Sequence, residues 1–119
     1  MTTATENNLI SAEGYYQALQ KRDVVGIARH LHPDVRFVGP LSDLTGKEAV
    51  LVAAKRFLAL LKGLTMHATF GSSERAMLTY DVDFGEPVGI WHTAVLMTFK
   101  DGLIANLELF YDARPSEKN

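Results

Sequence analysis

The side chains best suited to proton transfer in this chain of 119 residues are histidines and carboxylates in its second half. His92 is a candidate general base, because an unperturbed imidazole titrates near neutral pH. Strict strand alternation from Val95 places His92 on the outer face of a sheet, whereas a single β-bulge would turn it inward. His67 has the same two placements. Asp112, near the end of the last predicted strand, is either an acid at the mouth of a pocket or the residue that closes the end of the sheet.

Two residue pairs resemble ligand or catalytic pairs, but their spacing argues against both uses. His30 and His32 stand two residues apart, and such residues on a helix do not converge on one ion, so we expect no metal. Asp81 and Asp83 share one face of a strand whose other face is apolar, which favours a solvated outer face. The chain has no cysteine, which excludes thiol nucleophiles. Phosphate-loop and Ser-His-Asp signatures are absent, and we expect no cofactor.

Composition and length indicate one ordinary globular domain over residues 1–119, with 47% apolar and 22% charged residues. The net charge of −2 supplies no basic field, so we do not expect a nucleic-acid partner. No segment approaches the ~18 uninterrupted apolar residues of a membrane span. The polar start, residues 1–8, lacks the pattern of a secretory signal. We therefore expect a soluble, cytoplasmic protein that does not contact a membrane.

Apolar spacing predicts two helices before the first strand. Residues 9–21 carry apolar side chains at helical spacing. A second, short helix is expected over residues 23–31, with Asp23 as its N-cap. Pro33 is expected to end this helix, and residues 35–38 then form a short strand.

A third helix is predicted over residues 46–62. Thr45 and Glu48 have the spacing of a capping box, in which each side chain satisfies a backbone N–H of the other residue. The polar residues of this segment are few and recur at a seven-residue interval, so we expect a mostly buried helix. Gly63 is expected to be its C-cap.

After Gly63 the pattern changes to a period of two, which is typical of strands. Short links join the predicted strands, so we expect antiparallel pairing. The order is therefore α-α-β-α-β-β-β-β, an α+β fold with helices on one face of a sheet. The four later strands are expected at residues 64–70, 74–84, 88–99 and 103–111.

Both faces of the predicted strand 88–99 are largely apolar. The helices can cover only one face of the sheet, so the other face needs a different cover. A second subunit is the simplest one. We therefore predict a homodimer through the outer face of the sheet.

This order of elements, with the terminal strand Leu109-Phe110-Tyr111-Asp112, resembles the nuclear transport factor 2-like superfamily. The resemblance extends from about residue 9 to residue 112. It implies a cone-shaped fold, in which a curved, mixed and mostly antiparallel sheet wraps around three helices. It also implies an internal apolar pocket that takes a small apolar molecule.

Within the superfamily, the chain is most similar to ketosteroid isomerases and SnoaL-type polyketide cyclases. Residues 15–23, which read Tyr-Tyr-Gln-Ala-Leu-Gln-Lys-Arg-Asp, resemble the first helix of the isomerases. This match puts Tyr15 at the tyrosine that hydrogen-bonds the substrate oxyanion. Gly39 stands where the isomerases have their general-base aspartate, and Val95 stands where they have a protonated aspartate. The resemblance therefore implies a pocket without the isomerase reaction.

The same resemblance implies which side chains line the pocket. Tyr15 would be an oxyanion donor or a weak acid, or simply a core tyrosine. The alternative for the whole set is that these residues fill the core. Beside Tyr15, the implied lining consists of Phe37, Tyr80, Val82, Trp91, Thr93, Val95, Leu107, Leu109 and Tyr111.

Three functions fit these observations. The first is a cofactor-free enzyme of isomerase, cyclase, dehydratase or hydrolase type, in which Tyr15 stabilises negative charge and His92 or Asp112 moves the proton. The second is a module that binds a hydrophobic ligand without reaction, which the missing acidic positions favour. The third is a protein-interaction domain that uses the outer sheet.

Overall fold

A computed structural model describes residues 3–40 and 42–112 of the chain. In this part of the chain the model contains three helices and one six-stranded sheet, which confirms the predicted α+β fold. The elements in chain order are α1 (Ala4–Gln20), α2 (Val24–Arg29), β1 (Leu31–Gly39), β2 (Ser42–Thr45), α3 (Lys47–Leu60), β3 (Gly63–Gly71), β4 (Arg75–Asp83), β5 (Ile90–Lys100) and β6 (Leu103–Asp112).

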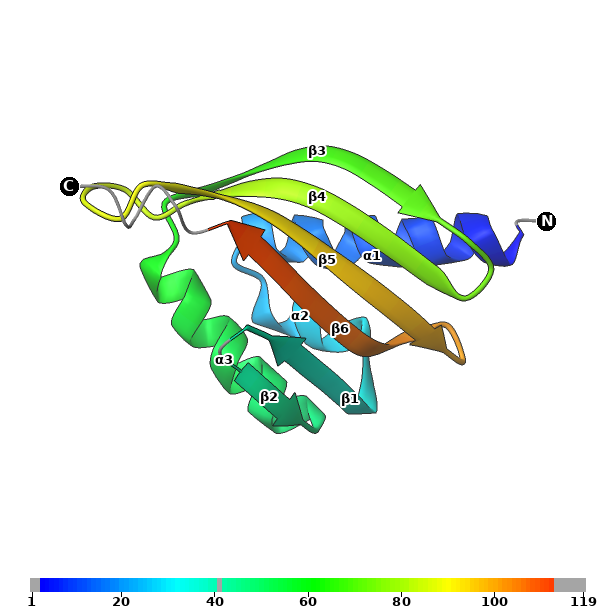
Figure 1. Ribbon diagram of the computed structural model, residues 1–119. Coiled ribbons are helices and arrows are strands. Elements are labelled where there is room, and N and C mark those ends of the chain that lie inside the picture. Colours follow the sequence, from blue (N-terminus) through cyan, green and yellow to red (C-terminus); the bar gives the residue numbers. More distant parts are fainter. Residues whose placement is uncertain (1–2, 41, 113–119) are drawn as a thin grey trace.

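The sheet has the strand order β2-β1-β6-β5-β4-β3 (Figure 1). β1 pairs with β6 in parallel, and the other neighbours are antiparallel. The sheet is therefore mixed and mostly antiparallel, as predicted. Among the described residues, no helix is long and apolar enough to cross a membrane.

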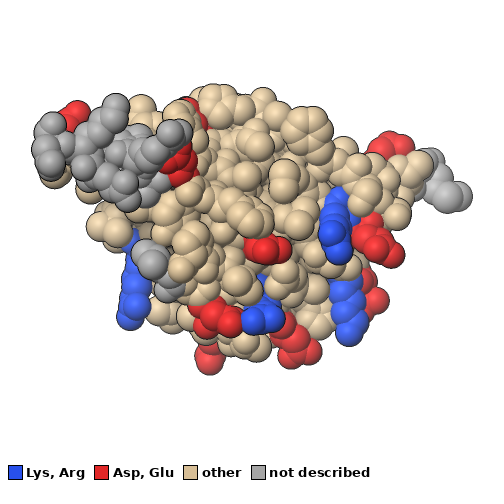
Figure 2. Space-filling view, viewed as in Figure 1, with Lys and Arg blue, Asp and Glu red and all other residues tan. Residues whose placement is uncertain are grey.

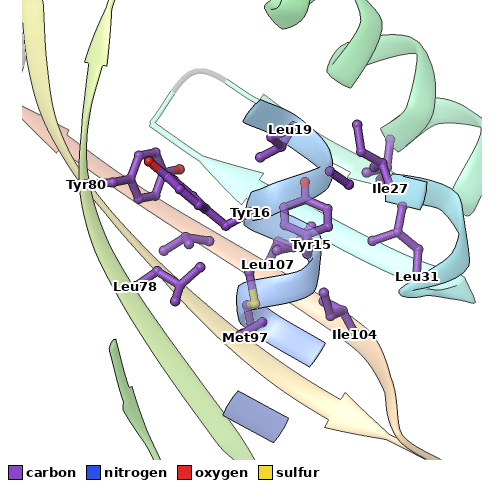
Figure 3. Packing of buried hydrophobic residues seen from close by; sticks show 14 of the residues in the cluster. Tyr15, Tyr16, Leu19, Ile27, Leu31, Leu78, Tyr80, Met97, Ile104 and Leu107 are labelled. Carbon is purple, nitrogen blue, oxygen red and sulfur yellow. The ribbon is translucent and has the colours of Figure 1, made fainter. Parts of the chain in front are cut away.

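The helices lie on one face of this sheet, which we call the inner face, and the opposite face is the outer face. α1 runs behind β3–β6, and α3 lies beside β1 and β2 (Figure 1). The core fills the space between helices and sheet (Figure 3). Its largest fully buried side chains come from both layers: Ile27, Leu31, Val35, Leu78, Met97, Ile104 and Leu107.

The start of α1 differs from the predicted start at residue 9, because a capping box forms earlier. The Thr3 hydroxyl accepts a hydrogen bond from the Glu6 backbone N–H at 3.1 Å. In return, the Glu6 carboxylate accepts a hydrogen bond from the Thr3 backbone N–H. This arrangement satisfies two N–H groups that the first helical turn leaves free. Apolar periodicity alone does not reveal this polar first turn.

The turn after α1 connects the first and third helices. Arg22 adopts a left-handed conformation with φ of 58°. Its guanidinium donates to the carbonyl oxygens of Leu58 and, at 2.7 Å, Leu61. These carbonyls lie at the C-terminal end of α3, where a helix has no internal donors for them. Arg22 thus supplies the C-terminal cap that was predicted for Gly63.

The predicted capping box of α3 is wrong. Thr45 ends β2, and the N-cap is Gly46, which has φ of +96° and makes no side-chain cap hydrogen bond. α3 is also less buried than predicted, since Val52 and Leu60 are exposed. Gly63 is the first residue of β3.

The short strand β2 was not predicted. It pairs with β1, where the Arg36 guanidinium donates two hydrogen bonds to the Asp43 carboxylate at 3.0 and 2.8 Å. Four largely exposed residues show no strong strand pattern, which is why the sequence did not reveal β2. β1 is also longer than predicted, because α2 ends at Arg29, with Asp23 as its N-cap, as predicted.

Candidate functional site

A cavity of about 240 Å³ lies between α1, α3 and the inner face of the sheet. Most of its lining residues are aromatic or aliphatic, and the polar side chains among them carry hydroxyl groups. It is smaller than the roughly 300–1,000 Å³ of sites for drug-sized ligands. The lining residues are Tyr15, Leu19, Phe37, Ser42, Val50, Ala53, Ala54, Phe57, Tyr80, Val95, Leu107 and Leu109.

Two tyrosines contribute phenol groups to the cavity wall. Tyr15 comes from α1 and Tyr80 from β4, and both are buried. Burial raises the pKa of Tyr15 to about 12. The pKa of Tyr80 is raised further, by burial first and then by the neighbouring Tyr15 and Tyr16. Both phenols are therefore neutral near pH 7 and can donate hydrogen bonds, but they do not act as bases.

Tyr16 follows Tyr15 on α1 but is not part of the cavity lining. Only 2% of it is exposed, and its ring meets the edge of Tyr80 at a centroid distance of 5.6 Å (Figure 3). Among the described residues its buried hydroxyl has no hydrogen-bond partner. Adjacent helix positions point in different directions, so the two tyrosines have different surroundings.

The structure divides the lining implied by the resemblance into two groups. The cavity wall includes Tyr15, Phe37, Tyr80, Val95, Leu107 and Leu109. The remaining residues lie beyond the cavity on the same inner face, nearer the β4–β5 connection; they are Val82, Trp91, Thr93 and Tyr111.

A chain of aromatic contacts connects the cavity wall to the second group. Phe57 of α3 lines the cavity and meets the edge of Phe84 at 6.0 Å. Phe84 in turn contacts Trp91, with 5.1 Å between the ring centroids, and Trp91 stacks on Tyr111, with 4.8 Å between the ring centroids.

Sequence reasoning missed half of the lining, because it considered mainly the strands. Leu19, Val50, Ala53, Ala54 and Phe57 come from α1 and α3, and Ser42 comes from β2. The apolar spacing of residues 46–62 was the signal that could have placed the α3 residues toward the sheet.

His92 does not reach the cavity. Its side chain is 67% exposed on the outer face, and its Nδ1 lies 2.6 Å from a carboxylate oxygen of Asp81. The register between β4 and β5 is unbroken from His92 to Val95, so the bulge that would have turned His92 inward is not there. Of the two predicted placements of His92 the structure therefore has the outer one, on the opposite side of the sheet from Tyr15.

His67 also lies on the outer face. A register irregularity between Met66 and Ala68 leaves His67 unpaired in the ladder. Its Nε2 lies 2.9 Å from the second carboxylate oxygen of Asp81. Asp81 thus bridges two imidazoles, and hydrogen bonds from His92 and then His67 lower the pKa of its carboxyl.

Asp112 is placed on the same outer face. It pairs with His92 across β5 and β6, whereas its neighbour Tyr111 pairs with the inner residue Thr93. The candidate catalytic residues are therefore not brought together: Tyr15 lies inside the cone, and His92 and Asp112 lie outside it.

The two remaining histidines have separate local contacts. The His30 ring packs against Gly14 of α1, and burial lowers its pKa. The Nδ1 atom of His32 accepts a hydrogen bond from the Asp34 backbone N–H at 3.0 Å. Among the described residues, no group of three histidines or carboxylates is arranged to hold a metal ion.

Comparisons with known proteins connect this geometry to a family. The model of the SnoaL-like domain matches residues 12–107. None of the curated proteins matches the chain. Among solved structures, a protein from Kribbella flavida DSM 17836 is 28% identical, with a TM-score of 0.83 over 92% of this chain and 89% of its own.

Two further structures share the fold at lower identity. A steroid delta-isomerase from Pseudomonas aeruginosa is 20% identical, with a TM-score of 0.78 over 93% of this chain and 86% of its own. An NTF2-like protein of unknown function from Cytophaga hutchinsonii is 19% identical, with a TM-score of 0.77 over 91% of this chain and 92% of its own. These likenesses show the nuclear transport factor 2-like fold.

Proposed function

The chain belongs to the SnoaL-like domain family, and we propose that it binds a small, flat, apolar molecule carrying one hydrogen-bond acceptor in the cavity beside Tyr15. The observation that carries this proposal is an apolar cavity whose titratable groups are two neutral phenols. Aromatic walls favour a planar ligand. A buried neutral phenol donates a hydrogen bond, so it favours a ligand with an oxygen that accepts one.

The cavity volume limits the size of the ligand. At about 240 Å³ it is below the ~300–1,000 Å³ typical of drug-sized ligands. We therefore propose a ketone, phenol or ether with one or two rings as the ligand class, and not a four-ring steroid.

Binding without turnover is favoured over the enzyme hypothesis. Proton transfer in an isomerase, cyclase, dehydratase or hydrolase needs a base within hydrogen-bond reach of the substrate. The cavity lining contains no carboxylate and no imidazole among the described residues. His92 and Asp112 lie across the sheet from Tyr15, so neither supplies that base.

The proposal is tested by a thermal-shift screen of one- and two-ring ketones, phenols and ethers, with a steroid ketone for size. A ligand at about 100 times its Kd adds about 2.7 kcal/mol, which raises the Tm of such a domain by on the order of 10 °C. Tyr15→Phe should raise the Kd of the ligands found in the screen about fivefold, because one hydrogen bond contributes about 1 kcal/mol.

Tyr16→Phe is the matched control, since it removes a buried hydroxyl on the same helix that does not line the cavity. The ligands found in the screen should bind the Tyr16→Phe variant with the same Kd as the wild type. Equal weakening by both variants, or a screen without any hit, would refute the proposed site. Each hit is also incubated with the protein and analysed by mass spectrometry, where formation of a product would restore the enzyme hypothesis.

A further inference from the structure

The cavity crosses the strands of the sheet, and its two ends differ in exposure. On successive strands it is lined by Ser42 of β2, Phe37 of β1, Leu107 and Leu109 of β6, Val95 of β5 and Tyr80 of β4. Ser42, at one end of this row, is exposed, whereas Val95 and Tyr80, at the other end, are buried. The enclosed end of the cavity is therefore the one at β4.

This enclosed end is covered from both sides. In Figure 2, packed and mostly uncharged side chains cover the middle of the outer face, on the opposite side of the strands from the cavity. On the inner side α1 lies against β4, and Tyr15 and Leu19, one helical turn apart, both line the cavity. A ligand that fills this end therefore removes the remaining solvent from the polar groups around it.

Two phenol hydroxyls are the polar groups concerned. Tyr15 and Tyr80 are both buried, and none of the hydrogen bonds within the described part of the chain involves either hydroxyl. Each phenol is neutral and has one proton to donate. A donor that a ligand covers without accepting from it costs free energy. A ligand that fills the enclosed end is therefore selected for acceptors that meet both hydroxyls.

The two phenols reach the cavity from different directions. Tyr16 follows Tyr15 about 100° further round α1, and its ring packs against that of Tyr80, with 5.6 Å between the centroids. In the view of Figure 3, Tyr16 lies between Tyr15 and Tyr80. The hydroxyls of Tyr15 and Tyr80 are still near enough for Tyr15 to raise the pKa of Tyr80. Two separate donors on one cavity suit two acceptor atoms of the same ligand.

We propose that Tyr80 is a second ligand-binding donor, and that the ligand is a neutral two-ring compound with two acceptor oxygens, one for Tyr15 and one for Tyr80. This inference rests on the proposed function and narrows its ligand class to cyclic keto-ethers and diketones. Ionised ligands do not fit, because the described lining residues include no lysine, arginine or histidine to pair with a buried charge. The edge contact with Tyr16 holds the ring of Tyr80 in place, so little freedom is lost when a ligand binds.

Two ligands that differ in one ring atom test the second acceptor. Chroman-4-one has a ring oxygen where 1-tetralone has a methylene group, and the two molecules otherwise have the same shape. Without a donor nearby this exchange weakens binding, because a polar atom replaces apolar surface. With Tyr80 as the donor, chroman-4-one should bind the wild type about fivefold more tightly than 1-tetralone. Isothermal titration calorimetry measures both Kd values.

Substitution of each tyrosine assigns the two oxygens. Tyr80→Phe should raise the Kd of chroman-4-one about fivefold and change that of 1-tetralone less than about twofold, because only chroman-4-one loses a hydrogen bond. Tyr15→Phe should raise both Kd values, since both ligands place their carbonyl oxygen there. Tyr16→Phe is the matched control, because its hydroxyl is buried outside the lining, and it should leave both unchanged. Each variant keeps its aromatic ring, and circular dichroism and Tm confirm that it is folded.

The outcomes separate this inference from the proposed function. A wild type that binds chroman-4-one no more tightly than 1-tetralone would overturn the second donor. Equal weakening of both ligands by Tyr80→Phe would do the same, because a purely structural role acts on both alike. In either case the site beside Tyr15 stands if Tyr15→Phe still weakens 1-tetralone. If neither ligand binds the wild type at about 1 mM, the proposed site and the second donor fail together.

Discussion

The two faces of β5 have opposite chemistry although they share one backbone. On the inner face, Val95 and Met97 are buried against the helices, and Val95 forms part of the cavity wall. On the outer face, His92 binds Asp81, and Leu96 lies among partly exposed apolar residues. The alternation of side chains thus separates the apolar cavity from a polar cluster of His67, Asp81 and His92 by the thickness of one sheet.

The largest expected difference between the two faces is in stability. Leu78 on the inner face of β4 is 1% exposed, whereas its neighbour Met77 lies on the outer face. Leu78→Ala should lower the free energy of unfolding by about 2–5 kcal/mol, because it leaves a cavity in the core. Met77→Ala should cost less than about 1 kcal/mol in the monomer. Urea titrations at submicromolar concentration measure both, and equal losses would contradict the division into faces.

A smaller effect of opposite sign is expected at Tyr16. Its buried hydroxyl has no hydrogen-bond partner among the described residues, and such a group costs about 1–3 kcal/mol. Tyr16→Phe keeps the ring against Tyr80 and removes the hydroxyl, so the free energy of unfolding should rise by about 1 kcal/mol. Urea denaturation measures the change, and a clear loss of stability would show that the hydroxyl has a partner in solution.

The smallest expected effect concerns Asp81. Hydrogen bonds from His92 and His67 lower the pKa of this carboxyl in the folded protein. A lowered pKa means that the carboxylate stabilises the fold above the unfolded pKa, and that this contribution is lost as pH falls through the folded pKa. Asp81→Asn should cost about 0.5 kcal/mol near pH 6, because the group is partly solvated. The difference from the wild type should disappear as pH falls through the lowered pKa of this carboxyl; a difference that persists after the carboxyl is protonated would contradict the assignment.

Alternation and turn signals in the sequence were enough to predict the sheet. The β4 and β5 patterns predicted the inner and outer sides, and the strands after Gly63 lie within two residues of the predicted bounds. These predictions succeeded because a strand with one face against helices must keep a period of two. The predicted cap at Thr45 failed because the same residue pairs in β2, and local spacing does not reveal such tertiary competition.

The cavity was harder to predict than the fold. The resemblance implied Tyr15 and Tyr80 as lining residues, and both lie in the cavity wall, but it could not indicate that Phe57 of α3 lines the cavity and contacts Phe84. Ring packing depends on how α3 lies across the sheet, and this is a property of the assembled layers. The sequence alone did not decide on which face of the sheet His92 lies, because a single β-bulge would turn its side chain to the other face.

The aromatic cluster at the end of the cavity gives the protein an internal optical reporter. Trp91 is the only tryptophan in the chain. Its ring is connected to the cavity through Phe84 and then Phe57, each in edge contact with the next. A ligand that displaces Phe57 therefore changes the surroundings of the single indole. Intrinsic fluorescence should report cavity occupancy directly, without a label and without any assumption about catalysis.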